Sequence, residues 1–357
     1  MKSQFLESIE RVQIKFLTFN YNTLGAKVIQ GFVLMKNLTH LTLGSHFTNE
    51  DGLKSIGTLK HLIHLCVDFN GIGLEGANYI SQLEKLESLS IRYNYIGAEG
   101  AKVISEMKTL TWLNVSSNRI GGEGAKAISQ MKQLTYLDIG DNKVGDEEVI
   151  LLSELDQLTA LSIDRINPDG INAISKMNKL VSLSINNCTI LDECEELSKM
   201  KQLTLLDIKS NGISAKGVKQ LSGLSQLTHL NISSNAFGDD GAKSISEIKQ
   251  LTELFVNDCQ ISDDGMKSLG DLNELTILDI SNNYITDEGS LYLTKLEKLT
   301  ALEVNNNELS YQGVKHMINM NQLTALSIRH NQFTFVQNEV FSQFKQLKLL
   351  NGISFRE

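Results

Sequence analysis

The sequence predicts an α/β solenoid of about fourteen short repeats, each adding one strand to a parallel sheet and one short helix to the opposite face. Three observations lead to this prediction. The chain is self-similar with a period of about 24 residues, apolar residues alternate in the first part of each repeat, and they recur every three positions in the second part. A single repeat cannot bury its own apolar side chains, so neighbouring repeats must stack around one continuous core.

A typical repeat is LTWLNVSSNRIGGEGAKAISQMKQ, residues 110–133. With its first leucine as position 1, positions 4 and 6 have the alternation of a strand with one buried face. Positions 16, 19 and 22 have the spacing of a short helix. The repeats begin at Ile14, Leu38, Leu62, Leu86, Leu110, Leu134, Leu158, Leu180, Leu203, Leu227, Leu251, Leu275, Leu299 and Leu323.

Two polar positions accompany this apolar pattern. Asparagine occupies position 9 in ten of the fourteen repeats, and Cys188 and Cys259 replace it in two others. A buried amide can satisfy the backbone groups left unpaired where each strand ends, so we expect an asparagine ladder beside the sheet. Glycine recurs at position 15, and an acidic residue usually precedes it. These acidic loops lack the dense ligand spacing of a calcium loop, and we assign them to helix N-termini, where a carboxylate is favoured.

The motif LxxLxIxxNxI, followed by a tail of the form GAKxIS, resembles the leucine-rich repeat family, in its ribonuclease-inhibitor-like class but with repeats shortened to about 24 residues. The resemblance covers residues 14–346. It implies a right-handed horseshoe with a parallel sheet on the concave side and helices on the convex side. Residues 1–13 are then expected to form an N-terminal helical cap, and residues 347–357 a C-terminal cap.

In this family the partner usually lies on the concave sheet, which implies a binding surface made of positions 3, 5, 7 and 8. Aromatic residues at these positions are concentrated in repeats 1–6. Because aromatic and arginine side chains dominate the binding free energy of many interfaces, we predict a protein-binding patch in repeats 3–6. The alternative is that these side chains merely cover the sheet and pack on one another. The predicted patch comprises Phe69, Arg92, Tyr93, Trp112, Tyr136, Asp138 and Asp141.

A weaker candidate is a metal site made of His40, His64 and Cys66. The two histidines occupy position 3 of adjacent repeats, and neighbouring strands could bring two imidazoles and a thiolate within reach of zinc. No fourth ligand is evident, so we expect polar side chains on a binding face and predict no cofactor. No Ser/His/Asp or Cys/His set recurs with supporting geometry, and no phosphate-binding glycine loop follows a strand, so we predict no enzymatic activity.

The net charge of −9 and the excess of acidic residues at the concave positions predict a partner with a neutral or basic surface, and no binding to nucleic acid. The sequence shows no apolar run of membrane-span length and no signal peptide, so we expect no membrane association and a cytoplasmic location. The predicted function is a non-catalytic protein–protein interaction scaffold. One alternative is a recognition subunit or inhibitor within an enzyme complex, such as a ubiquitin-ligase adaptor or a GTPase regulator. A surface adhesin is disfavoured by the missing signal peptide.

The regular pattern breaks in residues 158–202, where two successive repeats are shortened, the first by two positions and the second by one. The stretch LSIDRINPDGINAI, residues 161–174, contains Pro168, which is the one proline of the chain. Ile166 fits position 11, so the two missing positions include the ladder asparagine. Because a deletion leaves less loop to bind with, we expect a local change of curvature or a soft joint, stiffened by Pro168, and not a binding loop.

Overall fold

The computed structural model describes residues 14–19, 31–32, 34–44, 50–332, 343–351 and 353–354. They belong to two compact bodies, which divide between Leu180 and Val181. This boundary lies inside the irregular segment 158–202. The predicted N-terminal cap, residues 1–13, lies outside the described residues.

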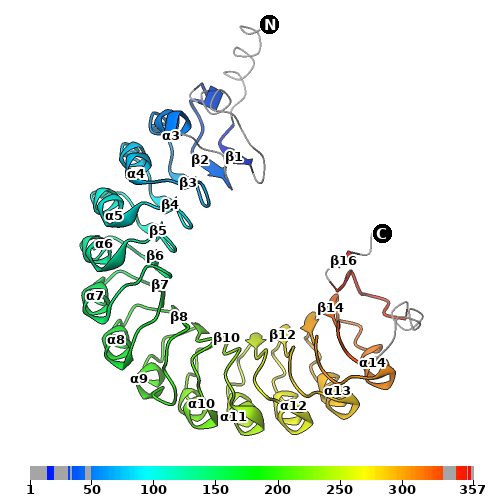
Figure 1. The fold of residues 1–357 in the computed structure, drawn as a ribbon. Helices are drawn as coiled ribbons and strands as arrows, with labels where there is room; N and C mark the ends of the chain where they lie inside the picture. The colour runs from blue at the N-terminus through cyan, green and yellow to red at the C-terminus, as the bar shows by residue number, and fades with distance from the viewer. Residues whose placement is uncertain are drawn as a thin grey trace, which may run out of the picture. The chain divides into compact units, whose positions relative to one another are not determined.

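In the N-terminal body, strands and helices alternate along the chain, with the strands on one side and the helices on the other (Figure 1). The strands are parallel and follow chain order, as the α/β solenoid prediction requires. The elements are β1 (Phe16–Phe19), β2 (His40–Leu43), α3 (Glu50–Ile56), β3 (His64–Cys66), α4 (Leu74–Ile80), β4 (Ser88–Ser90), α5 (Gly97–Ser105), β5 (Trp112–Asn114), α6 (Gly121–Ile128), β6 (Tyr136–Asp138), α7 (Asp146–Leu152), β7 (Ala160–Asp164) and α8 (Pro168–Ile174).

The C-terminal body repeats this arrangement and ends in a short antiparallel pair, β15 with β16 (Figure 1). That pair falls within the segment expected to form the C-terminal cap. The elements are β8 (Ser182–Asn186), α9 (Glu195–Ser198), β9 (Leu205–Asp207), α10 (Ala215–Leu221), β10 (His229–Asn231), α11 (Gly238–Ile245), β11 (Glu253–Phe255), α12 (Asp263–Leu269), β12 (Ile277–Asp279), α13 (Asp287–Leu293), β13 (Ala301–Glu303), α14 (Tyr311–Met317), β14 (Ala325–Ser327), β15 (Leu349–Leu350) and β16 (Ile353–Ser354).

The core of each body lies between the sheet and the helices, and the apolar repeat positions form it. In the repeat that begins at Leu110, positions 1, 4 and 6 are Leu110, Leu113 and Val115, and all three side chains are fully buried. The strands pair without slippage, so Leu113 lies opposite Leu137 of the next repeat. Burying a leucine or valine side chain contributes about 1.5–3 kcal/mol, so the repeated column stabilises the stacking of neighbouring repeats within each body.

The glycine at position 15 permits close packing between neighbouring helices. A Cβ atom added to Gly124 would lie 2.6 Å from the Cβ of Ile120 and 3.1 Å from the Cβ of Ala101 in α5. These separations are shorter than normal carbon–carbon contact, so a side chain at this position would push α6 away from α5.

The predicted asparagine ladder is confirmed. The Asn118 Nδ2 donates to the backbone carbonyls of Ile91, Val115 and Ser116 at 2.8–3.0 Å. Its backbone N–H donates in turn to Oδ1 of Asn142 in the next repeat, at 2.9 Å. Each amide therefore satisfies backbone groups in its own repeat and in the preceding one, where no strand partner is available.

A cysteine substitutes for the ladder asparagine at position 9 of the repeat that begins at Leu251. The Cys259 Sγ donates to the carbonyls of Ile232 and Asn257 at 3.5 and 3.3 Å. Burial raises the pKa of this thiol to about 12, so it stays protonated and keeps its donor. The sulfur takes the place of the amide oxygen as a weaker acceptor for the backbone of Asn235 in the preceding repeat.

A second link between repeats was not predicted from the sequence. We expected the acid at position 14 to serve its own helix, but the acid at position 13 bonds to the helix N-terminus of the following repeat. The Asp287 Oδ1 accepts from the backbone N–H groups of Ser310 and Gly313, both at 2.8 Å. Asp239 accepts in the same way from Ser262 and Gly265. The sequence pattern that accompanies this link is an acidic residue at position 13 of one repeat and a serine or threonine at position 12 of the next.

In the short repeat, β7 ends at Asp164 and α8 begins at Pro168. Proline suits the first turn of a helix, where its missing N–H is not needed, and the Asn167 side chain caps the helix by accepting from the N–H groups of Asp169 and Gly170. Ile166 is buried, in agreement with its assignment to position 11. This repeat therefore lacks positions 9 and 10. The soft joint expected here stays a prediction.

Candidate protein-binding surface

Apart from Arg92, which follows β4 at position 7, the predicted patch divides into two groups according to position in the repeat. Trp112, Tyr136 and Asp138 lie on strands β5 and β6. Phe69, Tyr93 and Asp141 occupy position 8, where the strand has already ended. The two groups form separate ring stacks, so the structure does not gather Tyr93, Trp112 and Tyr136 into one stack.

On the strands, the indole of Trp112 stacks on the phenol of Tyr136, with ring centroids 4.4 Å apart and planes inclined by 11°. The two residues are direct neighbours across β5 and β6. Asp138 follows on the same face, and its Oδ1 accepts from the N–H of Gly140 at 3.2 Å. Burial raises the pKa of Asp138, and burial together with this carboxyl raises the pKa of Tyr136. The stack is a half-buried apolar surface with a carboxylate at its edge.

Position 8 adopts a left-handed backbone conformation, with φ of 59° at Phe69 and 53° at Tyr93. This turn lets the backbone N–H of Phe69 donate to the carbonyl of Arg92, at 3.0 Å, beyond the end of the strand. The described repeats share this conformation, and most place a small polar residue in it. Those residues are Ser117, Asp141, Asn187, Ser210, Ser234, Asp258, Asn282 and Asn306. Phe69 and Tyr93, together with Arg165 and His330 at the same position, are therefore exceptions in a conformation that bulky residues rarely adopt.

The two aromatic residues at position 8 stack on each other, with centroids 4.3 Å apart. The guanidinium of Arg92 lies 5.3 Å from the Phe69 ring centroid and 5.1 Å from that of Tyr93, within the range of a cation–π contact. The Arg92 Nε also lies 3.7 Å from the Asp68 carboxylate. Phe69 remains 37% exposed and Tyr93 46% exposed, so the stack presents an apolar surface to solvent.

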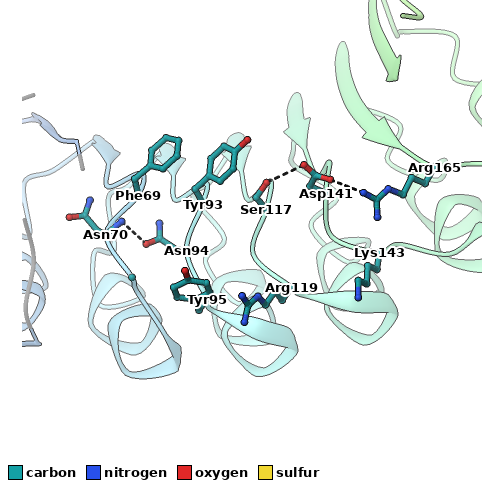
Figure 2. Close-up of a pocket in the computed structure, with 11 residues that line it drawn as sticks. Phe69, Asn70, Tyr93, Asn94, Tyr95, Ser117, Arg119, Asp141, Lys143 and Arg165 are labelled. Carbon is teal, nitrogen blue, oxygen red and sulfur yellow. Dashed lines mark hydrogen bonds and ion pairs between the residues drawn. The ribbon is translucent and has the colours of Figure 1, made fainter. Parts of the chain in front are cut away.

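Beside this stack runs a groove of about 610 Å³ (Figure 2). Side chains from position 8 of each repeat line one side, from Phe69 and Tyr93 through to Asp141 and Arg165. Side chains from position 10 line the other, and the ladder amides of Asn70 and Asn94 lie between the two rows, as Figure 2 shows.

The row at position 10 contains Tyr95, Arg119 and Lys143, none of which was predicted to belong to a site. Their signal in the sequence is an aromatic residue and two cations at one position of consecutive repeats. The groove therefore adds a second set of side chains to the predicted patch.

The groove carries more positive than negative charge. The Arg119 guanidinium lies over the Tyr95 ring at 4.6 Å from its centroid, and the Lys143 side chain is exposed. Arg165 is shared between the carboxylates of Asp141, at 3.2 Å, and Asp164, at 3.4 Å. Three cations therefore line the groove against one lining carboxylate, that of Asp141.

The two histidine candidates form a ring stack. The imidazoles of His40 and His64 stack with centroids 4.2 Å apart and planes inclined by 21°, and the Phe16 ring contacts His40 in a tilted arrangement, 4.2 Å between centroids. The Nδ1 of His40 is 2.8 Å from the Thr39 hydroxyl. Burial, and then His64, lower the pKa of His40, while burial and Asp68 raise the pKa of the Cys66 thiol. Among the described residues, no group of three His, Cys, Asp or Glu side chains is placed to hold a metal ion.

Within the described part of the chain, no helix has the length and apolar character needed to cross a membrane.

Comparison with known proteins agrees with the fold. Two family models described as leucine-rich repeat match the chain, one at residues 84–144 and the other at residues 200–222, 224–246, 250–270 and 273–293. No curated protein sequence matches the chain. The ribonuclease-inhibitor-like class stays a prediction, because neither model distinguishes it.

Two solved structures share the architecture over nearly the whole chain. An internalin from Listeria monocytogenes is similar at 21% identity, with a TM-score of 0.51, over 99% of this chain and 89% of that one. A leucine-rich repeat protein from Leptospira interrogans is similar at 19% identity, with a TM-score of 0.52, over 97% of each chain. At these identities the likeness concerns the fold alone.

Proposed function

The chain is a leucine-rich repeat protein, and we propose that it is a non-catalytic scaffold that binds a protein partner on the sheet face of its N-terminal body. Proteins of this family generally act as interaction scaffolds. The proposed contact surface is the predicted patch, which comprises Phe69, Arg92, Tyr93, Trp112, Tyr136, Asp138 and Asp141.

The observation that carries the proposal is the pair of solvent-accessible ring stacks in repeats 3–6. Trp112 with Tyr136 and Phe69 with Tyr93 present four aromatic rings on successive strands and turns, with Arg92 over the second pair. Rigid aromatic side chains bury much apolar area at a low cost in conformational entropy, and arginine adds directed hydrogen bonds, so both types concentrate binding free energy at interfaces. In the C-terminal body, position 3 includes small side chains such as Ser182, Ala301 and Ala325.

We propose that the partner surface facing the strands is neutral or basic. Asp138 lies beside the Trp112–Tyr136 stack, while Arg92 is engaged by Asp68. The same charge distribution disfavours nucleic acid on the strands. We further propose a reducing, cytoplasmic location, because Cys66, Cys194 and Cys259 are reduced thiols and the last two are buried.

A second candidate function uses the same surface within a larger assembly. The chain would then be the recognition subunit or inhibitor of an enzyme complex, of the ubiquitin-ligase adaptor or GTPase-regulator type. The two functions differ in the proteins that the surface retains. A scaffold retains a non-enzymatic partner, whereas a recognition subunit or inhibitor retains one defined enzyme complex.

The test compares affinity capture by the wild-type chain with capture by the double variant Trp112→Ala, Tyr136→Ala. A protein that the wild-type chain retains is then titrated into the wild-type chain, and the emission of Trp112 reports binding. The same protein is titrated into the double variant, and calorimetry reports binding there. Truncation of a central aromatic residue costs about 2 kcal/mol or more, so the double variant should bind more than roughly tenfold more weakly.

The matched control is Tyr284→Ala, Tyr311→Ala, which removes two aromatic rings from the C-terminal body. It should retain the same proteins as the wild type. Equal capture by all three chains would show that the strand stack is not the binding surface.

A further inference from the structure

We infer that the groove between positions 8 and 10 of repeats 3–7 binds an extended, acidic peptide segment. An apolar side chain of that segment would lie against Phe69 and Tyr93, and its carboxylates would lie at Arg119 and Lys143. The inference rests on the proposed function, because it assigns part of the protein partner to this groove.

The dimensions of the groove suit an extended chain. It crosses five consecutive repeats, from Phe69 to Arg165, all in the N-terminal body. Neighbouring strands lie about 4.8 Å apart, so four intervals span about 19 Å, and an extended peptide covers that length with about six residues. The amides of Asn70 and Asn94 between the two rows are already bonded to backbone groups of the ladder. Recognition therefore falls to the side chains of the two rows and not to main-chain pairing.

One end of the groove is aromatic. The Phe69–Tyr93 stack and Tyr95, which is 57% exposed, meet there. The left-handed conformation costs an ordinary L-residue about 1–2 kcal/mol. Serine, asparagine and aspartate fill the same turn in most other repeats, so the aromatic residues are not required by the fold. Backbone strain retained at an exposed surface marks positions at which a side chain serves binding.

The other end of the groove is cationic. Arg119 and Lys143 adopt the left-handed conformation too, with φ of 59° and 56°, where Gly71 and Gly212 occupy the same position of their repeats. The Arg119 guanidinium lies over the Tyr95 ring, and this contact holds the planar group in place while its N–H edge can donate to a carboxylate. A chain of net charge −9 thus places two exposed cations beside an exposed aromatic surface.

The groove and the strands therefore favour opposite charges. The strand stack has Asp138 at its edge, whereas the groove has Arg119 and Lys143. An acidic peptide with an apolar residue at one end complements the groove along its whole length. Single-stranded nucleic acid also combines stacking with cation contacts. The net negative charge of the protein disfavours it, and the experiment includes it as an outcome.

The experiment measures fluorescence anisotropy with a fluorescein-labelled peptide of two phenylalanines, one glycine and four glutamates. The comparison probes are the same peptide with four lysines and a mixed-sequence single-stranded oligonucleotide. We expect the glutamate peptide to bind the full-length protein, and the lysine peptide and the oligonucleotide to bind at least tenfold more weakly. Raising the salt concentration should weaken glutamate-peptide binding, because exposed charge pairs are screened.

Charge reversal locates the site. Arg119→Glu, Lys143→Glu should weaken glutamate-peptide binding at least tenfold, whereas Lys126→Glu, Lys243→Glu, which reverses two exposed helix residues, should change it less than twofold. A second variant, Phe69→Asn, Tyr93→Asn, uses a residue that suits the left-handed turn and should also weaken binding. Thermal unfolding followed by circular dichroism checks that each variant is folded.

Three results would overturn the inference: no binding of the glutamate peptide, equal binding of the lysine peptide or oligonucleotide, or no loss of binding in the folded groove variants. The proposed function fails separately. Trp112→Ala, Tyr136→Ala should leave peptide affinity within twofold while it removes partner capture. If that variant still captures every partner but the groove variants lose the peptide, the groove is a peptide site and the strand stack is not the partner-binding surface.

Discussion

The ring of Tyr93 lies parallel to the ring of Phe69, with centroids 4.3 Å apart and planes inclined by 10°. The two residues are one repeat apart in the sequence, occupy the same turn and share the left-handed conformation. The repeat thus imposes a backbone conformation that suits small polar residues, while the side chains at these two positions form an exposed aromatic stack. The aromatic side chains at these two positions should therefore lower the stability of the turn while they provide a surface for binding, and the two effects can be measured separately.

Replacing Phe69 by asparagine should leave the protein more stable than replacing it by alanine. Both changes remove the stack with Tyr93, but asparagine tolerates the left-handed turn better, so the difference in unfolding free energy should be about 1 kcal/mol in favour of Phe69→Asn. Chemical denaturation of the two variants measures it. Equal stabilities would show that the turn is not strained.

Gly124→Ala should destabilise the protein although alanine is the better helix former. The added Cβ meets Ile120 and Ala101, and overpacking of about 1–3 kcal/mol outweighs a propensity gain of about 1 kcal/mol. The control is Gly122→Ala in the same helix, where the added Cβ meets only the carboxylate end of the flexible Glu148 side chain. There the unfolding free energy should stay unchanged or rise. A stabilised Gly124→Ala variant would contradict the close packing of α5 and α6.

Asn118→Ala should lower the unfolding free energy by about 3 kcal/mol, because several buried backbone groups lose their partner and each costs about 1–3 kcal/mol when unsatisfied. Restoring the ladder at its cysteine position offers the converse change. Cys259→Asn should stay within about 1 kcal/mol of the wild type, since the carbonyls of Ile232 and Asn257 already accept a donor there. Loss of folding in Cys259→Asn would show that this repeat is not interchangeable with its neighbours.

The link from Asp192 to the next repeat should depend on pH. The Ser214 hydroxyl donates to the Asp192 carboxylate at 2.7 Å and lowers its pKa, with the Ser214 and Gly217 N–H groups contributing. A lowered folded-state pKa adds stability above the unfolded value of about 3.9, and that stability is lost as the pH falls through the folded value.

Titration by carboxyl NMR tests this link. Ser214→Ala should raise the pKa of Asp192 and should destabilise the protein more at pH 7 than at pH 3. Ser222→Ala, which alters a hydroxyl at the other end of α10, should leave the Asp192 titration unchanged. An unchanged Asp192 pKa in Ser214→Ala would rule out the link.

Much of the fold was predictable because the same residue pattern recurs in many repeats. Alternating apolar positions such as Leu113 and Val115 identify the strand, and apolar residues three positions apart, such as Ala125 and Ile128, identify the helix. The asparagine ladder followed from the need of buried backbone groups for partners. Trp112 and Tyr136 were predicted as neighbours because equal positions in adjacent repeats meet across a parallel sheet.

The groove was not predictable in the same way. Periodicity assigns residues to a face, but it does not show where a strand ends or that the next residue turns left-handed. For that reason Tyr93 was grouped with Trp112, although the turn places it in a different stack, and Tyr95, Arg119 and Lys143 were not considered. The link made by the carboxylate of Asp287, at position 13, was not predicted either, because its partners lie one repeat further along the chain.

The sequence by itself determined the repeat register, the buried columns and the ladder, because each depends on a pattern that recurs at fixed spacing. Only the tertiary structure decided which exposed residues share a surface. That outcome depends on hydrogen bonds such as Phe69 N–H to Arg92 O, which bend the chain after each strand. The bend separates position 8 from the strand and sets it beside position 10, and so forms the groove.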